Sequence, residues 1–456
     1  MSDYFAIKGK VPYKVSEAEY KALEAAIDSD ELTALALELG NIPSPSRSEA
    51  AASAYVFDWM KREGFAPRSV GATPERQNII GEYGGKAEGA NLLFTAHLDT
   101  ESPTYEPDLD SAKYRPQTLE NREWLECWLE DDKLFGYPIA NDRGPMSCFM
   151  IAAKALRKAG ISLAGKLYLT ACPGEIGPEP IEDRKGVDYL GKDIGAHYLF
   201  HHGGVAPDYA IAAEGCDFGL TWVGSGYAIF RIRIYGQGIF TPIMEHPENI
   251  AEHPNPIYRL GPIIDALHKW GKTLPERHRY ESEGGIAIPK TQIDSIKAGI
   301  PYSFGTGTEI VSIYLEVGLT PKQKAADILH ELNALMRIFD IEGFDIEPIV
   351  VRHGFEADAD AVSPLVAAVA EATKLTLDEP LQRANPVYSS MWRDQNVFNM
   401  HRIPAVTTGM TRWRPTPADL KKSALIYALT ALAICGRAPE GAGEVAYKPV
   451  YGDNPF

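Results

Sequence analysis

The chain of 456 residues is long enough for two domains, and its 45% hydrophobic and 23% charged residues are typical of a folded globular protein. A formal net charge of −17 disfavours binding to nucleic acid or to an anionic membrane surface. The longest apolar stretch, 424–435, is too short to cross a membrane, and the amino terminus lacks the apolar centre of a signal peptide, so we expect a cytoplasmic protein.

The first half of the chain alternates short apolar runs with helical segments. The clearest helical pattern covers 145–160, and the apolar runs are 78–84, 91–96, 166–171 and 208–213. Strands that read as continuous apolar runs are buried on both faces, and their alternation with helices indicates a mostly parallel, doubly wound α/β sheet. In such sheets the ligand site lies at the carboxyl ends of the strands.

The pattern changes after Glu214 and predicts a smaller domain inserted into the first. A half-buried strand and a helix come first, two further strands, a second helix and a last strand follow, and this β-α-β-β-α-β order is that of a ferredoxin-like α+β domain. In chain order these predicted elements are 227–236, 257–271, 285–296, 309–319, 322–339 and 346–353. Helical periodicity then returns, which predicts a discontinuous main domain, 1–217 plus 355–456, around an inserted domain, 218–354.

Acidic and imidazole side chains stand next to the predicted strands and helices of the main domain. His97 and Asp99 follow one strand, Glu175 and Glu214 follow two others, and Asp142 precedes the helix at 145. Residues 97 and 99 of an extended segment point the same way, so Asp99 is expected to accept a hydrogen bond from His97 and to fix its tautomer. One imidazole plus carboxylates suits a divalent transition ion such as Zn²⁺ or Mn²⁺, which acidifies a bound water.

The order of the motifs resembles a known family. The segments TAHLDT (95–100), ANDRGP (140–145) and GEIG (174–177), then Glu214 and the inserted domain, are similar to metal-dependent hydrolases. That family includes aminoacylase-1, glutamate carboxypeptidase, acetylornithine deacetylase, succinyl-diaminopimelate desuccinylase and tripeptide aminopeptidase. The resemblance implies catalytic roles for six residues. They are His97 and Glu214 as ligands of one metal, Asp142 as the bridge between two metals, Glu175 as a ligand of the second metal, Asp99 as the partner of His97, and Asp394 as an acidic residue near the site.

The chain departs from the family pattern at four places. Gly174 replaces the glutamate that serves as general base, and no histidine follows His401 to complete the second metal site. Phe240 stands where the family has a histidine for the substrate carbonyl, and Gly318 where it has an arginine for the substrate carboxylate. The ligands of one metal remain, so we expect a changed chemistry at a site with one firmly bound metal and a doubtful second one.

These observations predict a metal-dependent hydrolase that cleaves a C–N bond of a small molecule with metal-activated water. Deamination of an aminoaromatic acid such as 5-nitroanthranilate fits, because attack on a ring carbon needs no polarised carbonyl, and Glu175 would carry the proton. Arg412, Trp413 and Arg414 stand where the lost ligand loop was, and they predict an anion-binding pair beside an aromatic plane for a carboxylate-bearing substrate. A solvated loop is the alternative for these three residues.

Two other functions remain open from the sequence. The first is a dinuclear peptidase or N-acyl amino acid amidohydrolase, whose missing ligand comes from elsewhere, for example His353 or a histidine of a partner subunit. The second is a non-catalytic binding protein that has kept the pocket. The family resemblance of the inserted domain also implies a dimer, from which a larger homo-oligomer can be built.

Overall fold

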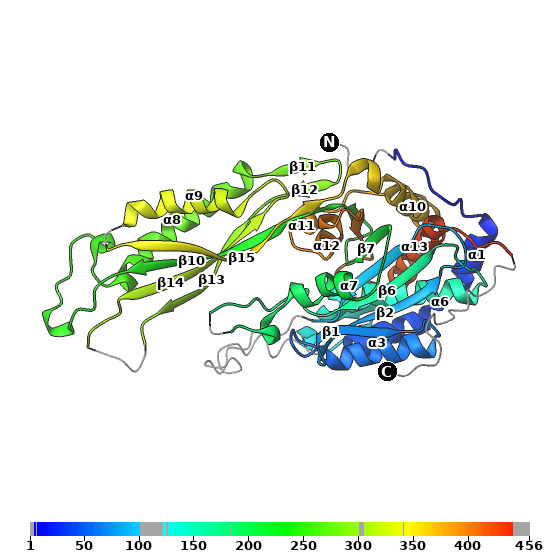
Figure 1. The fold of residues 1–456 in the computed structure, drawn as a ribbon, viewed down its shortest axis with the longest axis horizontal. Helices are drawn as coiled ribbons and strands as arrows, with labels where there is room; N and C mark the ends of the chain where they lie inside the picture. Colours follow the sequence, from blue (N-terminus) through cyan, green and yellow to red (C-terminus); the bar gives the residue numbers. More distant parts are fainter. Residues whose placement is uncertain are drawn as a thin grey trace, which may run out of the picture.

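A computed structural model describes residues 4–5, 7–100, 122–124, 126–182, 184–300, 305–340 and 342–440. Figure 1 shows an elongated molecule with a large helix-covered sheet at one end and a small sheet at the other. The predicted α/β architecture with an inserted α+β unit is confirmed.

The large sheet has seven strands, and its four central strands are parallel. In spatial order they are β1 (Arg68–Thr73), β2 (Arg76–Gly84), β6 (Lys166–Cys172), β3 (Leu92–His97), β7 (Tyr209–Ala213), β17 (Ala405–Thr408) and β8 (Leu220–Thr221). β6, β3, β7 and β17 pair in parallel, whereas β1, β2 and β8 are antiparallel to their neighbours. β1 and β2 are joined by a tight turn, and a connection that short only permits antiparallel pairing.

Helices cover both faces of this sheet because alternate strand residues point to opposite sides. Leu92 and Ile79 pack in the larger core, whereas their neighbours Leu93 and Ile80 pack in a separate core on the other face. The larger core is formed with α1 (Glu17–Ala26), α2 (Ser29–Gly40), α3 (Ala50–Arg62), α6 (Gly144–Lys158), α10 (Ala359–Leu377) and α13 (Pro417–Cys435), and the other with α7 (Ala196–His202) and α12 (Gln395–Met400).

The small sheet is antiparallel and has the strand order of a ferredoxin-like fold. Its two helices, α8 and α9, cover one face in Figure 1, and their apolar residues share a core with the strands. The strands lie in the order β13 (Thr291–Ala298), β14 (Ile310–Leu319), β10 (Gly226–Tyr235) and β15 (Phe344–Arg352), with α8 (Pro256–Arg277) and α9 (Ala325–Met336). The predicted strand 285–296 is divided at Pro289, and its first part, β12 (Gly285–Ala287), pairs with β11 (Tyr280–Ser282).

Short elements connect the two parts of the molecule. β9 (Val223–Gly224) pairs with β16 (Phe355–Glu356), and β8 before them pairs with β17 of the large sheet. The remaining short elements lie within one part or the other. They are β4 (Trp128–Glu130), β5 (Lys133–Phe135), α11 (Pro386–Ser389), a π-helical turn η2 (Ile139–Arg143), and the 3-10 turns η1 (Arg122–Trp124), η3 (Val187–Tyr189), η4 (Lys192–Ile194), η5 (Thr241–Ile243), η6 (Ile250–Glu252) and η7 (Arg337–Phe339).

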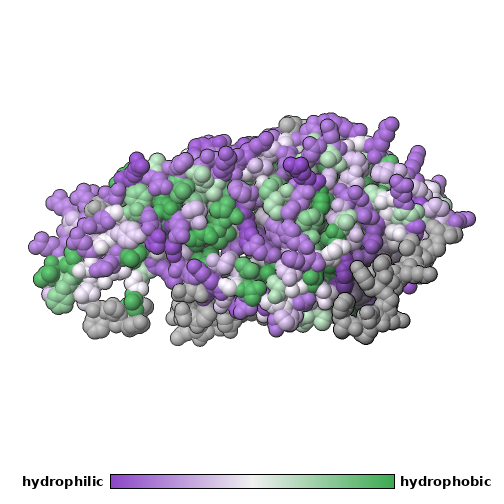
Figure 2. All heavy atoms as spheres, viewed as in Figure 1, coloured by the Kyte–Doolittle hydropathy of each residue, from purple (hydrophilic) through white to green (hydrophobic). Residues whose placement is uncertain are grey.

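The face of the molecule drawn in Figure 2 is mainly hydrophilic. Figure 2 shows apolar side chains gathered in patches, including some over the small sheet and its helices. None of the helices among the described residues is long and apolar enough to span a membrane.

Candidate metal centre

The candidate residues meet at one edge of the large sheet, where four neighbouring parallel strands end. β3 ends at His97, and Glu175, Glu214 and Arg412 follow β6, β7 and β17. Asp142 lies in η2, at the start of α6. The carboxyl ends of parallel strands share one edge, which is why residues far apart in the sequence come together here.

The buried imidazole of His97 is held in one tautomer by the backbone. Its Nδ1 lies 2.7 Å from the carbonyl oxygen of Asp99, and because a carbonyl can only accept, Nδ1 carries the proton. In the neutral imidazole Nε2 therefore keeps its lone pair, which a metal needs. The sequence predicts the carboxylate of Asp99 as the partner, but its Oδ1 is farther from Nδ1, at 3.5 Å. The main chain of Asp99 orients His97 more closely than its side chain does.

The carboxylate of Asp99 instead holds the turn that follows β6. It accepts hydrogen bonds from the backbone N–H groups of Glu175, at 3.0 Å, and Ile176, at 2.9 Å, and from Oγ of Ser46, at 2.9 Å. Burial alone would raise the pKa of Asp99, but these donors and His97 outweigh it and lower the pKa to about 2. Asp99 thus fixes Glu175 next to the end of β3.

Asp142 and Glu214 complete a compact cluster with His97. One ligand atom from each of the three lies within 4.8 Å of the other two, and this is the only such cluster in the part of the chain that the structure describes. Oδ1 of Asp142 and Oε2 of Glu214 are buried without a hydrogen-bond partner. Burial and the nearby Glu214 raise the pKa of Asp142. Two buried carboxylates with unsatisfied oxygens are suited to a cation.

A buried arginine keeps Asp142 against the end of β3. The guanidinium of Arg143 donates from Nη2 to the carbonyl of Leu98, at 2.5 Å, and to Oγ of Ser44, and from Nη1 to the carbonyl of His97, at 3.4 Å. These bonds tie the start of α6 to the segment that carries His97. The position of Asp142 relative to His97 is therefore set by the contacts of Arg143 with main-chain carbonyl groups.

The structure explains why position 174 carries glycine where the family resemblance leads us to expect a glutamate. Gly174 has φ +74°, and a Cβ atom there would lie 2.5 Å from the carbonyl oxygen of Gly191. This backbone excludes a glutamate without rearrangement of the turn. Glu175 is the acidic residue that remains in this motif, and it lines the cavity next to the cluster.

Two arginines flank Glu214. Nε of Arg393 lies 3.3 Å from Oε1 of Glu214, and Nη1 of Arg412 lies 3.9 Å from Oε2. Arg412 is among the predicted residues, but Arg393 is not. The only signal for it in the sequence is its place beside Asp394, because nothing in the segment 390–394 predicts that an arginine is buried.

Asp394 lies at the N-terminal cap of α12 and is buried near Glu175. Burial and the charge of Glu175 raise its pKa to about 7. The structure thus places this predicted residue close to the site, although outside the three-residue cluster.

A cavity of about 710 Å³ opens between the cluster and the small sheet. Glu175, Arg393 and Arg412 line it from the large domain, and Asp294 and Glu316 line it from β13 and β14. The remaining lining residues are Asn141, Ile176, Glu179, Lys192, Gly226, Tyr227, Ile229, Lys290, Thr291, Gln292, Gly318, Ser390, Met391 and Trp392.

Some predicted residues lie elsewhere. Trp413 and Arg414 do not line this cavity: Trp413 is 57% exposed, and Arg414 donates to Glu123 at 2.7 Å and covers the ring of Phe135. Arg412 therefore lacks its expected arginine partner. Among the described residues, His353 is likewise outside the cavity lining and the three-residue cluster.

The loop that follows Glu175 is bound to the small sheet by ion pairs. Arg352 of β15 donates to Glu179, at 3.0 Å, and to Asp193, at 2.6 Å. Arg231 of β10 donates to Glu182 at 2.6 Å. The two parts of the molecule are thus linked through the same loop that begins beside the cluster.

The fold is shared with metallopeptidases of solved structure. Aminopeptidase PepT from Bacillus cereus superposes with a TM-score of 0.61 at 15% identity, over 90% of this chain and 99% of that one. The dipeptidase Dug1p from Saccharomyces cerevisiae gives a TM-score of 0.63 at 11% identity, over 91% of this chain and 99% of that one. YxeP from Bacillus subtilis, a dinuclear metal-binding peptidase of the M20 family, gives 0.55 at 14% identity over 91% and 99%. No protein-family model matches the sequence. The fold expected from the family resemblance is therefore confirmed.

Proposed function

We propose that this protein is a metal-dependent hydrolase that cleaves a C–N bond of a small molecule at a site with one divalent ion. The observation that carries the proposal is the cluster of His97, Asp142 and Glu214, whose ligand atoms lie within 4.8 Å of one another. The unpartnered oxygens of Asp142 and Glu214 and the lone pair on Nε2 of His97 fit a transition ion such as Mn²⁺ or Zn²⁺. These three residues would hold it.

The chemistry divides between the ion and the chain. A divalent transition ion lowers the pKa of water to near neutrality and so supplies a nucleophile. Glu175, fixed by its backbone bond to Asp99, faces the cavity and accepts the proton that the nucleophile loses. It then returns this proton to the leaving nitrogen, so that an amine or ammonia departs in neutral form.

A single ion fits the charges around the cluster better than two. The second site of the family lacks its histidine, and the guanidinium groups of Arg393 and Arg412 lie beside Glu214. Two guanidinium groups bring the same formal charge as a second divalent ion, and they repel one. This supports the mononuclear centre over the dinuclear peptidase alternative.

The finer proposal for the substrate is an aminoaromatic acid, such as 5-nitroanthranilate. Trp392 and Tyr227 give the cavity aromatic walls, and Arg412 is available for a carboxylate. Phe240, at the family position of the carbonyl-polarising histidine, is 54% exposed and does not line the cavity. Substitution at a ring carbon needs no such group. We also propose that the insertion 218–354 acts as a lid, because β13 and β14 form one wall of the cavity.

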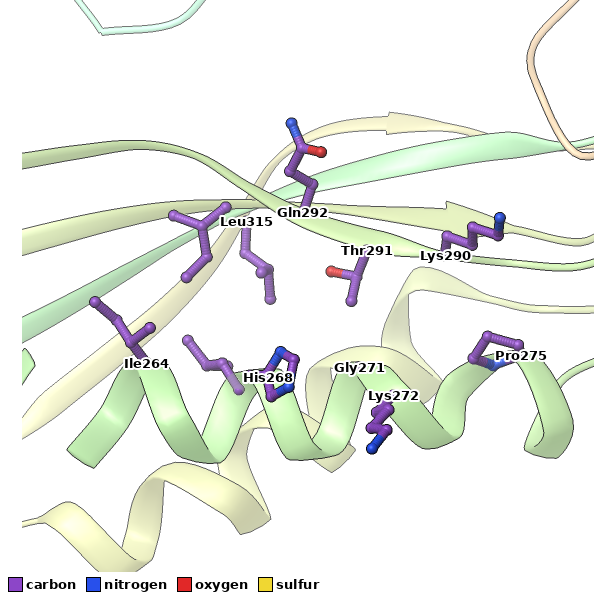
Figure 3. A pocket seen from close by; sticks show the side chains of 11 residues that line it. Ile264, His268, Gly271, Lys272, Pro275, Lys290, Thr291, Gln292 and Leu315 are labelled. Carbon is purple, nitrogen blue, oxygen red and sulfur yellow. The ribbon is translucent and has the colours of Figure 1, made fainter. Parts of the chain in front are cut away.

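The small domain offers a surface for the proposed homo-oligomer. Figure 3 shows a second cavity, of about 530 Å³, between α8 and β13, with Ile264, His268 and Leu315 on its walls. β13 is an edge strand of its sheet in the described part of the chain, and Ile296 on it is 39% exposed. Edge strands with apolar side chains readily pair with a strand of a second chain. Size-exclusion chromatography with light scattering measures the mass of the protein in solution and so tests for the proposed homo-oligomer.

The proposed function is tested by metal content and turnover on the same sample. Purified protein loaded with Mn²⁺ or Zn²⁺ is assayed against 5-nitroanthranilate, other aminobenzoates, N-acyl amino acids and dipeptides, while the metal per chain is measured. One metal per chain with release of ammonia or an amine supports the proposal. Two metals per chain with peptide cleavage support the dinuclear peptidase, and ligand binding without any turnover supports the non-catalytic binding protein.

A further inference from the structure

Arg393 has an unusual environment for a buried cation. It lies between α11 and α12, is only 5% exposed and lines the cavity beside the metal cluster. Nη1 donates to the carbonyl of Trp392 at 3.1 Å, but Nε and Nη2 are buried without a hydrogen-bond partner. Nε is near Glu214, at 3.3 Å, without the alignment of a hydrogen bond. Buried guanidinium N–H groups normally donate hydrogen bonds. The Nε and Nη2 groups of Arg393 are therefore suited to a ligand that accepts hydrogen bonds.

The charges around Arg393 point to an anionic ligand. The guanidinium groups of Arg393 and Arg412 share one carboxylate, that of Glu214, at 3.3 Å and 3.9 Å. A divalent ion held by Glu214 would compete with both guanidinium groups for this negative charge. A ligand with a carboxylate of its own would then restore a negative partner beside them.

The walls next to Arg393 favour a flat apolar body on this anion. Trp392 and Tyr227 line the cavity, and the ammonium of Lys192 lies 5.4 Å and 5.7 Å from the centres of their rings. Ile176 also contributes to the lining. An aromatic ring packs well against such side chains.

We propose that Arg393 is the principal anchor for the carboxylate of an aromatic acid in this cavity, with Arg412 as its second contact. A guanidinium binds a carboxylate through two parallel N–H donors, and the unpartnered Nε and Nη2 of Arg393 form one such pair. The inference deepens the proposed hydrolase function and rests on it for the reaction. The binding itself does not require turnover.

The test uses benzoate and its neutral analogue benzamide as probes, titrated calorimetrically into the full-length protein, once metal-free and once loaded with Mn²⁺. We expect the wild-type protein to bind benzoate at least about tenfold more tightly than benzamide, because only benzoate forms charge-assisted bonds. Arg393→Met should weaken benzoate binding by about 10- to 100-fold and leave benzamide binding within about threefold. Arg393→Lys keeps the charge but loses the paired donors, so an intermediate loss is expected.

Arg414→Met is the matched control, because Arg414 is on the surface, pairs with Glu123 and does not line the cavity. It should leave the affinity for both probes unchanged. Unchanged benzoate affinity in Arg393→Met and Arg393→Lys would overturn the inference, and so would a wild-type protein that binds benzamide as tightly as benzoate, a result that needs no variant. If benzoate binding depends on Arg393 but no C–N bond is cleaved, the inference stands and the proposed function fails.

Discussion

The two halves of the candidate site differ in how completely they are built and in what holds them. The half around His97, Asp142 and Glu214 has three ligands in one cluster, and the backbone of the large domain fixes it. The half around Glu175 has no histidine ligand among the residues that the structure describes, and its loop is bound to the small sheet by ion pairs. In the proposed function the complete half holds the metal and the Glu175 half carries the proton, so the two halves should respond differently to substitution.

The largest effect is expected from His97→Ala, which removes the only imidazole of the complete half. Three side chains would hold the ion, so the loss of one should abolish stoichiometric Mn²⁺ or Zn²⁺ binding and lower turnover by at least about 10³-fold. Metal per chain is measured by mass spectrometry after dialysis. His353→Ala is the control and should bind metal normally. A His97→Ala variant that keeps a full metal complement would show that the cluster is not the metal site.

Glu175→Gln tests the other half. If Glu175 carries a proton, this variant should keep one metal per chain and lose about 10²- to 10⁴-fold in kcat, the range for a missing general acid or base. Asp142→Asn is the matched comparison, because it should lose the metal together with activity. Depletion of metal in Glu175→Gln at saturating Mn²⁺ would assign Glu175 as a ligand and would favour a dinuclear centre.

Alanine substitutions at Gly174 and Gly160 distinguish a steric clash from backbone strain. Gly174 and Gly160 both have positive φ, +74° and +67°, but a Cβ atom meets a carbonyl oxygen at Gly174 and nothing within 4 Å at Gly160. Gly174→Ala should therefore lower the free energy of unfolding by about 2 kcal/mol more than Gly160→Ala does. Denaturation in urea measures both. Equal losses would mean that the turn adapts easily and that the absent base has no steric cause.

The smallest effect concerns pH and the ion pairs of the Glu175 half. The hydrogen bond from Arg352 lowers the pKa of Asp193. The ionised carboxylate therefore stabilises the folded contact above the unfolded pKa of about 4. This stabilisation is lost as the pH falls through the lower pKa of the folded protein. Between pH 5 and pH 3, hydrogen exchange corrected for intrinsic rates should increase more in segment 184–195 than in segment 92–99.

Asp193→Asn provides the control for this pH effect. The variant lacks the titrating group, so segment 184–195 should exchange faster already at pH 5 and should change little on further acidification. If the wild-type protein showed the same increase in both segments, the two halves would not differ in what holds them.

The sequence predicted the main elements of the fold because their signals are local. The apolar runs of β3, β6 and β7 and the helical period of α6 appeared where expected. The parallel order of the central strands followed from the alternation of strands and helices. β8, β9 and β16 were not predicted, because strands of two residues have no periodicity.

The site was predicted in part for the same reason. His97, Asp142 and Glu214 come together because each stands at the end of a strand or the start of a helix that the sequence reveals. The role of the Asp99 main chain and the burial of Arg393 depend on contacts between distant segments. Of the two arginines expected to form an anion-binding pair, only Arg412 lines the cavity. Arg414 donates a hydrogen bond to Glu123 instead.

The sequence by itself determined which residues are candidates to bind a metal and at which edge of the sheet they meet. The periodicity of strands and helices, and the residues that end them, are local features of the sequence. The tertiary structure alone decided that a side chain at position 174 would clash with the backbone, that Arg393 is buried with two donors that make no hydrogen bond, and that the loop after Glu175 is bound to the small sheet. These features depend on distances between side chains that lie far apart in the chain, and no local pattern encodes such distances.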